Sequence, residues 1–186
     1  IEKIRKLKWN TSRDIELSFA YNRQEDEHTG YLLNAEELIE SLIDVVSKNG
    51  NLLLGIGPRS DGTIPVKQLE VLRGTGEWLR VNGDAVYCTR PWVRAEGSAD
   101  GGAVRVRFAQ REKEARLFAA LLDRPARRKV ALQGLKAAAG TTVRLLGGDA
   151  PLRWRQRGRD LEVVLPAGMP WSAAYALEIT PIPASI

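Results

Sequence analysis

The sequence predicts an α/β part followed by an all-β part, and three observations support this. A helical pattern leads directly into a short, continuous apolar run, which is the order of elements in a (β/α) barrel. A second helical pattern follows that run. After Pro91 and Trp92 the chain changes to short alternating segments separated by glycine turns. We therefore expect a barrel-type segment over residues 1–92 and a small antiparallel β-sandwich over residues 93–186.

The first helix is expected to begin after Asn34. Apolar residues recur every three to four positions from Leu38 to Val46, so the helix has one apolar face. Asn34, with Glu37 at the third helical position, resembles a capping box. Gly50 is expected to supply the left-handed residue that ends the helix.

A buried strand and a second helix complete the barrel-type segment. The run Leu-Leu-Leu-Gly-Ile-Gly-Pro from Leu52 predicts a strand buried on both faces, as parallel strands are. The loop 58–63 follows the carboxyl end of that strand, the side where barrel enzymes place their sites. The second helix is expected from about Pro65, which suits a first turn, to Gly83.

The second half of the chain is expected to be entirely β. Its turns are marked by glycines, and an alanine-rich stretch at 136–140 is expected to be a loop. Six short strands at this spacing are typical of a sandwich or a barrel. The expected strands lie near residues 103–109, 115–122, 128–133, 142–146, 152–157 and 160–165.

The net charge of +5 is unevenly distributed. Residues 1–92 hold 12 Lys and Arg against 14 Asp and Glu, whereas residues 93–186 hold 16 against 9. The excess arginines fall at alternating strand positions, which favours a solvated sheet face over a polyanion site, and nucleic acid is not an expected partner. The alternating positions are Arg105, Arg107, Arg153, Arg155 and Arg157.

Other classes of protein are disfavoured. No apolar run approaches the roughly 18 residues of a membrane span, no signal peptide is recognisable, and the chain opens as though cut from something longer. The single cysteine, Cys88, cannot form an internal disulfide and is expected to pack in a half-buried strand rather than act as a nucleophile. Neither a metal site nor a cofactor is expected. The arginine and alanine usage is typical of a GC-rich bacterium, and the compartment stays open.

The densest site-like stretch runs from Trp9 to Glu27 and is expected to be mostly loop. It combines aromatic residues, an arginine and several carboxylates. Aromatic faces pack on sugar rings, arginine binds hydroxyl oxygens, and a carboxylic acid can protonate a departing glycosidic oxygen. The alternative is a solvated polar loop. His28, beside this stretch, is expected to be an exposed residue rather than a catalyst.

Three blocks of sequence narrow this interpretation. They are residues 9–22 (WNTSRDIELSFAYN), residues 44–65 (DVVSKNGNLLLGIGPRSDGTIP) and residues 76–92 (GEWLRVNGDAVYCTRPW). In this order they resemble the α-L-fucosidases of glycoside hydrolase family 29. The resemblance implies that residues 1–92 are the C-terminal part of a (β/α)8-type catalytic barrel, and that a C-terminal β-domain follows it.

The resemblance also implies a retaining exo-α-L-fucosidase that removes terminal fucose by double displacement. In such enzymes an aspartate attacks the anomeric carbon and a glutamate serves as acid and then base, with the two carboxyls about 5–5.5 Å apart. In relatives whose loop reads Tyr-Asn-Arg-x-Glu the glutamate is the acid/base, and here it falls on Glu25. Asp26 and Glu27 are the rival positions.

Two further positions match sugar-binding residues of the family. Arg13 falls on a sugar-contacting arginine, the alternative being an ion pair with Asp14 or Glu16. Leu52 falls on a position that lines the pocket for the fucose methyl group, the alternative being core packing. The sequence departs from many relatives at three positions: Asn10 replaces Glu, Ala20 replaces Gly, and Gly55 replaces Asn.

The family's nucleophile would precede Ile1, so this chain is expected to be inactive without the N-terminal part of the same enzyme, which is its expected partner. The expected substrate is a fucosylated oligosaccharide or glycoconjugate, and a homo-oligomer is possible. The alternative function is a non-catalytic carbohydrate-binding or interaction module built on the β-domain. Trp154 and Trp171 are its candidate aromatics, although each is expected to fill the core.

Overall fold

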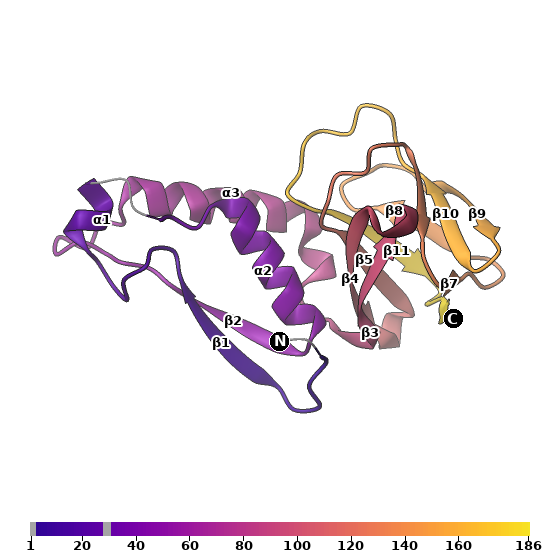
Figure 1. The fold of residues 1–186 in the computed structure, drawn as a ribbon, viewed down its shortest axis with the longest axis horizontal. Helices are drawn as coiled ribbons and strands as arrows, with labels where there is room; N and C mark the ends of the chain where they lie inside the picture. The colour runs from indigo at the N-terminus through magenta and orange to yellow at the C-terminus, as the bar shows by residue number, and fades with distance from the viewer. Residues whose placement is uncertain (1–2, 28–30) are drawn as a thin grey trace.

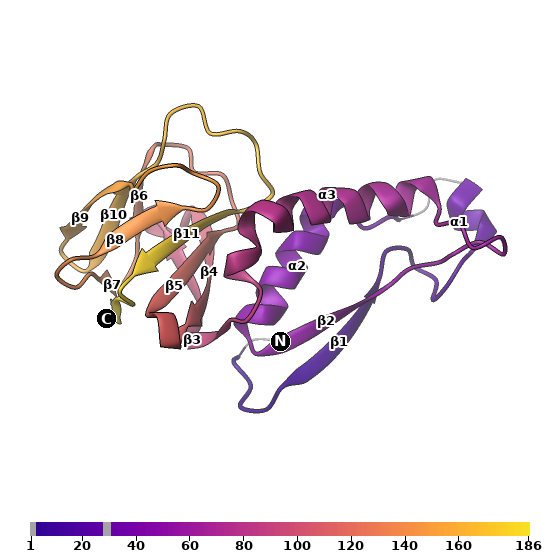
Figure 2. The ribbon, with the colours of Figure 1, turned by 180° about the vertical axis from the view of Figure 1, so that it is seen from behind.

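The computed structural model describes residues 3–27 and 31–186. An elongated α/β part lies beside a rounded β part, and α1 and β9 mark the two ends of the molecule (Figures 1 and 2). The α/β part contains, in order, β1 (Trp9–Asp14), α1 (Arg23–Glu27), α2 (Ala35–Ser47), β2 (Gly50–Gly55) and α3 (Val66–Asn82).

The two strands of the α/β part form a parallel pair. They pair along their whole length, from Trp9 opposite Gly50 to Asp14 opposite Gly55, and α2 crosses between them. The prediction of a parallel strand is confirmed for β2. The prediction of a loop is wrong for β1, because its polar alternation gave no apolar signal. In the described part of the chain neither strand has a second partner, so both outer edges of the pair are open.

Within the described residues, only one face of the parallel pair is covered. On the face towards the helices, Leu52 and Leu54 pack against a small core of Ile15, Leu33, Leu38 and Val71. On the other face Leu53 is 67% exposed. The expectation that β2 is buried on both faces is therefore not met here.

The helix α2 begins as predicted and ends differently. Asn34 and Glu37 form a full capping box, in which the backbone N–H of Glu37 donates to Asn34 Oδ1 at 2.8 Å. The left-handed residue after the helix is Asn49, with a φ of 73°, and not Gly50. Asn49 tolerates this conformation and donates from Nδ2 to the carbonyl oxygen of Arg5 at 2.9 Å. Gly50 instead lies against Trp9, where a Cβ would approach the indole to 2.6 Å.

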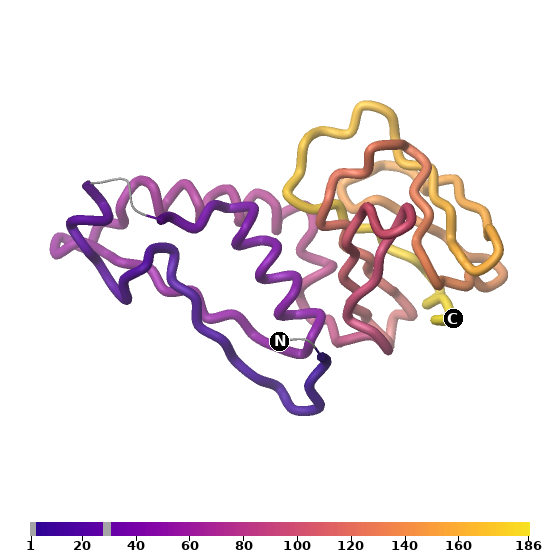
Figure 3. Tube along the Cα trace, viewed as in Figure 1, coloured from indigo at the N-terminus to yellow at the C-terminus, as the bar shows by residue number. Residues whose placement is uncertain are grey.

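The helix α3 runs between Pro65 and Gly83, as predicted. It joins α2 in covering the β part, and the trace in Figure 3 shows α2 lying between the parallel pair and the sheet. Trp78 donates from Nε1 to the carbonyl oxygen of Ala174 at 2.9 Å. The apolar cluster at this junction comprises Ile39, Ile43, Trp78, Ala120, Leu122 and Ala174.

The β part is one eight-stranded antiparallel sheet that curls around a common core. Its strand order is β8-β11-β5-β4-β3-β6-β10-β9, and a short pair, β12-β7, lies beside it. The backbone N–H of Leu152, just before β9, donates to the carbonyl oxygen of Val143 on β8. Because β8 and β9 are the two edge strands, this contact nearly closes the sheet. This arrangement is consistent with the predicted β-sandwich. The strands are β3 (Arg90–Ala99), β4 (Val104–Arg111), β5 (Arg116–Leu121), β6 (Lys129–Leu132), β7 (Leu135–Lys136), β8 (Thr142–Leu145), β9 (Arg153–Arg157), β10 (Asp160–Val164), β11 (Tyr175–Thr180) and β12 (Ala184–Ser185), and the 3-10 turns are η1 (Gly83–Ala85), η2 (Asp100–Gly102) and η3 (Glu112–Glu114).

All six predicted strands are confirmed, and four were missed. Strand β3 carries an irregularity between Pro91 and Glu96 that breaks the alternation, and β11 contains alanine and glutamate, which are weak strand formers. The remaining two, β7 and β12, contain two residues each. Most of the missed strands form through pairing with strands distant in the sequence, which local sequence patterns do not reveal.

Three side-chain predictions are wrong, one just before the β part and two within it. Cys88 lies exposed in a turn with a φ of 58°, not in a strand. Trp171 is 62% exposed, whereas Trp154 packs against the core as expected. Arg107 faces α2 rather than solvent, because its Nε donates to Asp44 Oδ1 at 2.6 Å. Arg105 pairs with both Glu40 and Asp123.

Candidate active site

The carboxyl end of β1 leads into the segment that carries the predicted site. Ile15 continues the parallel pairing by donating to the carbonyl oxygen of Gly55 at 3.2 Å, and it accepts from Leu33 at 2.8 Å. Its side chain is buried. The chain is therefore fixed at Ile15, and the loop beyond it returns through α1, where Glu25 lies.

Glu25 is half-buried and surrounded by donors from its own loop. Its Oε2 accepts from the backbone N–H of Leu17 at 3.1 Å and of Ser18 at 3.3 Å. Its Oε1 accepts from Asn22 Nδ2 at 3.0 Å and from the hydroxyl of Ser18. These hydrogen bonds, the Ser18 hydroxyl first, hold the pKa of Glu25 below its usual value. In this chain Glu25 is a fixed, ionised acceptor. Sequence reasoning missed Ser18 and Asn22, although both lie within seven residues of Glu25.

The two rival carboxylates have different surroundings. Asp26 accepts from Arg59 Nη2 at 2.7 Å and from Tyr21 Oη at 3.2 Å, and the hydrogen bond from Arg59 is the main cause of its lowered pKa. This pair ties α1 to the loop 58–63. Glu27 is exposed and lies 3.9 Å from Arg23. His28 lies outside the described residues.

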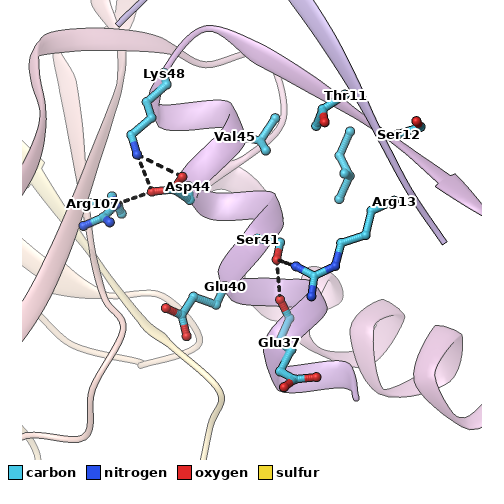
Figure 4. A pocket seen from close by; sticks show the side chains of 11 residues that line it. Thr11, Ser12, Arg13, Glu37, Glu40, Ser41, Asp44, Val45, Lys48 and Arg107 are labelled. Atoms are coloured by element: carbon cyan, nitrogen blue, oxygen red, sulfur yellow. Dashed lines mark hydrogen bonds and ion pairs between the residues drawn. The ribbon is translucent and has the colours of Figure 1, made fainter. Parts of the chain in front are cut away.

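Arg13 and Leu52 line one cavity of about 550 Å³ on the helix side of the parallel pair (Figure 4). Arg13 donates to the hydroxyl of Ser41 and, at 3.2 Å, to that of Tyr31. It makes no ion pair within residues 3–27 and 31–186, so the alternative pairing with Asp14 or Glu16 is not seen.

The rest of this cavity is polar. Figure 4 shows Asp44 pointing towards Lys48 and Arg107 on the side of the cavity opposite Arg13. The charges of these three side chains are therefore paired with one another. Glu25 is not among the lining residues. The structure thus brings Arg13 and Leu52 together and leaves Glu25 apart, beyond the end of β1.

Two of the sequence departures have a local explanation. Ala20 has a φ of 74°, a left-handed conformation that favours the glycine expected there. A Cβ on Gly55 would lie 1.7 Å from Asp14 Oδ1, so an asparagine there requires Asp14 to move. Asn10 accepts from Asn51 at 3.0 Å on the uncovered face of the pair.

No group of three or more potential ligands gathers as a metal site in the part of the chain that the structure describes. Among the same residues, no helix has the length and apolar character needed to cross a membrane.

Comparison with known proteins identifies both parts of the chain. The family model of α-L-fucosidase matches residues 1–84, and that of the α-L-fucosidase C-terminal domain matches residues 99–180. Plasma α-L-fucosidase of Pongo abelii is 38% identical over 180 residues, which is 93% of this chain and 38% of the relative. The α-L-fucosidase of Branchiostoma floridae is 35% identical over 81% of this chain and 32% of its own length.

Solved structures agree with the sequence comparison. The Thermotoga maritima α-fucosidase in complex with fucose superposes with a TM-score of 0.82 at 40% identity, over 96% of this chain and 40% of that chain. The α-L-fucosidase isoenzyme 1 from Paenibacillus thiaminolyticus superposes with a TM-score of 0.75 at 27% identity, again over 40% of its length. The chain spans between 32% and 40% of the length of these proteins. It belongs to the α-L-fucosidases, glycoside hydrolase family 29.

Proposed function

We propose that the whole protein is a retaining exo-α-L-fucosidase and that this chain supplies its acid/base. Residues 1–92 would be the last β–α units of the catalytic barrel, and residues 93–186 the accessory β-domain. The open edges of β1 and β2 support this, because a closed barrel requires a further strand on each side of the pair. The N-terminal part of the same enzyme would provide those strands and the nucleophilic aspartate.

Glu25 is the proposed acid/base, and the main support is that hydrogen bonds fix its carboxylate in one position. It follows the carboxyl end of β1, the end at which barrel enzymes build their sites. Four donors fix its carboxylate, whereas Asp26 is committed to Arg59. A held carboxylate keeps one geometry through both the protonation and the water-activation steps.

A proton donor needs a pKa nearer neutrality than Glu25 has in this chain. In a retaining pair, a second carboxylate about 5–5.5 Å away raises the pKa of the first, because two negative charges repel. We propose that the nucleophile in the N-terminal part supplies this charge. The pKa of Glu25 should then rise when the barrel is completed.

Arg13 and Leu52 are proposed to bind the fucose. In this chain both side chains face α2, and Leu52 packs partly on the helix-side core. The proposal therefore requires that they reach the site beside Glu25 when the barrel is completed, where Leu52 would line the sugar's methyl group and the guanidinium of Arg13 would donate to its ring or hydroxyl oxygens. Arg13 has only hydroxyl partners in the described residues, so its charge is not neutralised by a carboxylate. Arg13→Ala in the completed enzyme should weaken inhibition by fucose-like iminosugars without unfolding the protein. Unchanged inhibition would exclude this role.

The test of the proposed function is hydrolysis by the chain together with the N-terminal part of the enzyme. The pair should release nitrophenol from nitrophenyl α-L-fucoside, and the chain alone should not. Glu25→Ala should slow hydrolysis of fucosides with poor leaving groups by about 10²–10⁴-fold, and of activated fucosides far less, because only poor leaving groups need protonation. Azide should partly restore the activity of the variant.

Glu27→Ala is the matched control, because Glu27 is exposed two residues away and, among the residues that the structure describes, its one ion pair is the 3.9 Å contact with Arg23. It should retain activity on both classes of substrate. Equal losses on good and poor leaving groups in Glu25→Ala, or the selective loss in Glu27→Ala instead, would contradict the assignment of Glu25.

A further inference from the structure

A basic groove lies on the outer face of the β part. Two of its strands, β9 and β10, are at the end of the molecule opposite α1 (Figure 1). The groove has a volume of about 520 Å³ and runs across the three neighbouring strands β6, β10 and β9. Its lining includes Arg128, Lys129, Arg153, Arg155 and Glu162. The family function described above assigns nothing to this surface.

The strand register places the cations of the groove in rows. Arg153 on β9 is opposite Val164 on β10, which is opposite Lys129 on β6. Two inter-strand spacings put the backbones of Arg153 and Lys129 about 10 Å apart. Both side chains are exposed, and neither makes an ion pair or side-chain hydrogen bond with any residue that the structure describes. These two charges are available to a ligand.

The floor of the groove differs from its rim. Glu162 is buried there and pairs with Arg155 at 2.7 Å and Arg157 at 3.6 Å. Beside it, Val164 adds a half-buried apolar patch. The groove therefore presents cations at its rim and a carboxylate next to an apolar surface at its floor.

This combination of cations and an apolar surface suits an anionic sugar better than it suits nucleic acid or a lipid surface. The C–H face of a sugar ring fits the apolar patch, and its sulfate or carboxylate substituents fit the guanidinium of Arg153 and the ammonium of Lys129, which are not committed to Glu162. Nucleic acid favours aromatic platforms for base stacking, whereas Trp154 is packed on the core and donates to the carbonyl oxygen of Thr141 at 2.9 Å. None of the large exposed apolar side chains in the described residues belongs to β6, β9 or β10, which disfavours a lipid surface.

We propose that this groove binds an anionic carbohydrate, a saccharide carrying sulfate or carboxylate groups, through Lys129 and Arg153. The site is separate from Glu25 and does not depend on hydrolysis. It would hold the protein on a charged glycan while the catalytic end of the molecule acts elsewhere.

The experiment is calorimetric titration of the chain with a short dextran sulfate, with uncharged dextran of the same length as a control. Dextran sulfate should bind, its affinity should fall steeply between about 50 and 200 mM salt, and dextran should not bind. The double variant Lys129→Gln/Arg153→Gln should lose at least about tenfold in affinity. The matched variant Lys113→Gln/Arg124→Gln removes the same charge from two exposed residues outside the groove, and should lose less than about twofold.

Several outcomes would overturn the proposal. They are the absence of binding by dextran sulfate, equal losses in the two double variants, and binding of single-stranded DNA or polyglutamate as tight as that of dextran sulfate with the same dependence on Lys129 and Arg153. Unchanged urea unfolding of the variants excludes misfolding as the cause of a loss. Because no step requires fucoside hydrolysis, these outcomes are independent of the catalytic test.

Discussion

At the scale of single residues, Ala20 has a backbone conformation that suits glycine better. Its φ of 74° lies in the left-handed region, which costs an L-residue about 1–2 kcal/mol. Glycine removes that cost but loses about 0.5–1 kcal/mol through its greater freedom in the unfolded chain. Ala20→Gly should therefore leave the free energy of unfolding unchanged or raise it by up to about 1.5 kcal/mol, as measured by urea unfolding.

The control for Ala20→Gly is Ala126→Gly, at another exposed loop alanine whose φ is not positive. There only the entropic cost applies, so the free energy of unfolding should fall by about 0.5–1 kcal/mol. An equal fall in both variants would show that the left-handed conformation of Ala20 carries no strain.

Glu25 should titrate below the ordinary glutamate value of 4.5, because donors from its own loop stabilise the charged form. A lowered pKa means that this interaction stabilises the fold above pH 4.5 and is lost as the pH falls through the pKa of folded Glu25. Ser18→Ala should raise the pKa of Glu25, followed by carboxyl carbon NMR. Ser60→Ala, at an exposed serine elsewhere, should not. An unmoved Glu25 pKa in Ser18→Ala would contradict the hydrogen bond.

Sequence patterns located most elements and the capping residues of α2, because these depend on local periodicity and on residues three positions apart. They missed β1, since the partner that makes Trp9–Asp14 a strand lies about 40 residues away. They also misassigned Arg107, because an alternating arginine looks the same whether it faces water or a helix. Arg13 and Leu52 were named only by resemblance, and their shared cavity depends on the packing of α2 over both strands.

At the scale of elements, Asp44 joins α2 to the sheet. It accepts from Lys48, the residue after α2, at 2.8 Å and from Arg107 on β4 at 2.6 Å, and Glu96 on β3 pairs with the same two cations. Asp44→Asn leaves both cations with half their neutralising charge. We expect the free energy of unfolding to fall by about 1.5–3 kcal/mol, the range for hydrogen bonds to charged groups, in urea unfolding at neutral pH.

The control for Asp44 is Glu40→Gln, also on α2 and also facing β4 through Arg105. That pair is largely exposed, so its loss should cost less than about 1 kcal/mol. Similar losses in both variants would mean that the partly buried position of Asp44 adds nothing to the strength of its pairs.

The same junction should be sensitive to acid. Burial raises the pKa of Asp44, but the hydrogen bonds from Lys48 and Arg107 outweigh it and leave the pKa below its ordinary value of 3.8. The contribution of Asp44 is therefore complete above pH 3.8 and lost as the pH falls through the pKa of the folded state. The stability difference between wild type and Asp44→Asn should shrink across that range. A constant difference would contradict the assignment of the acid sensitivity to Asp44. Glu96, which pairs with the same two cations, would then be the remaining acid in the network.

At the scale of the whole molecule, a substitution on the uncovered face of the parallel pair should affect association with the N-terminal part of the enzyme but not the stability of this chain. Leu53 is 67% exposed on that face, so Leu53→Ser should change the free energy of unfolding of the chain by no more than about 0.5 kcal/mol. If the N-terminal part of the enzyme completes a barrel over this face, Leu53 becomes buried, and its loss should weaken association by about 1.5–3 kcal/mol, roughly 10–100-fold.

Val93→Ser is the matched control, because Val93 is equally exposed, at 72%, on β3 of the other part. It should change neither quantity. Association measured by calorimetry that is equally tight for wild type and Leu53→Ser would show that the N-terminal part does not cover this face.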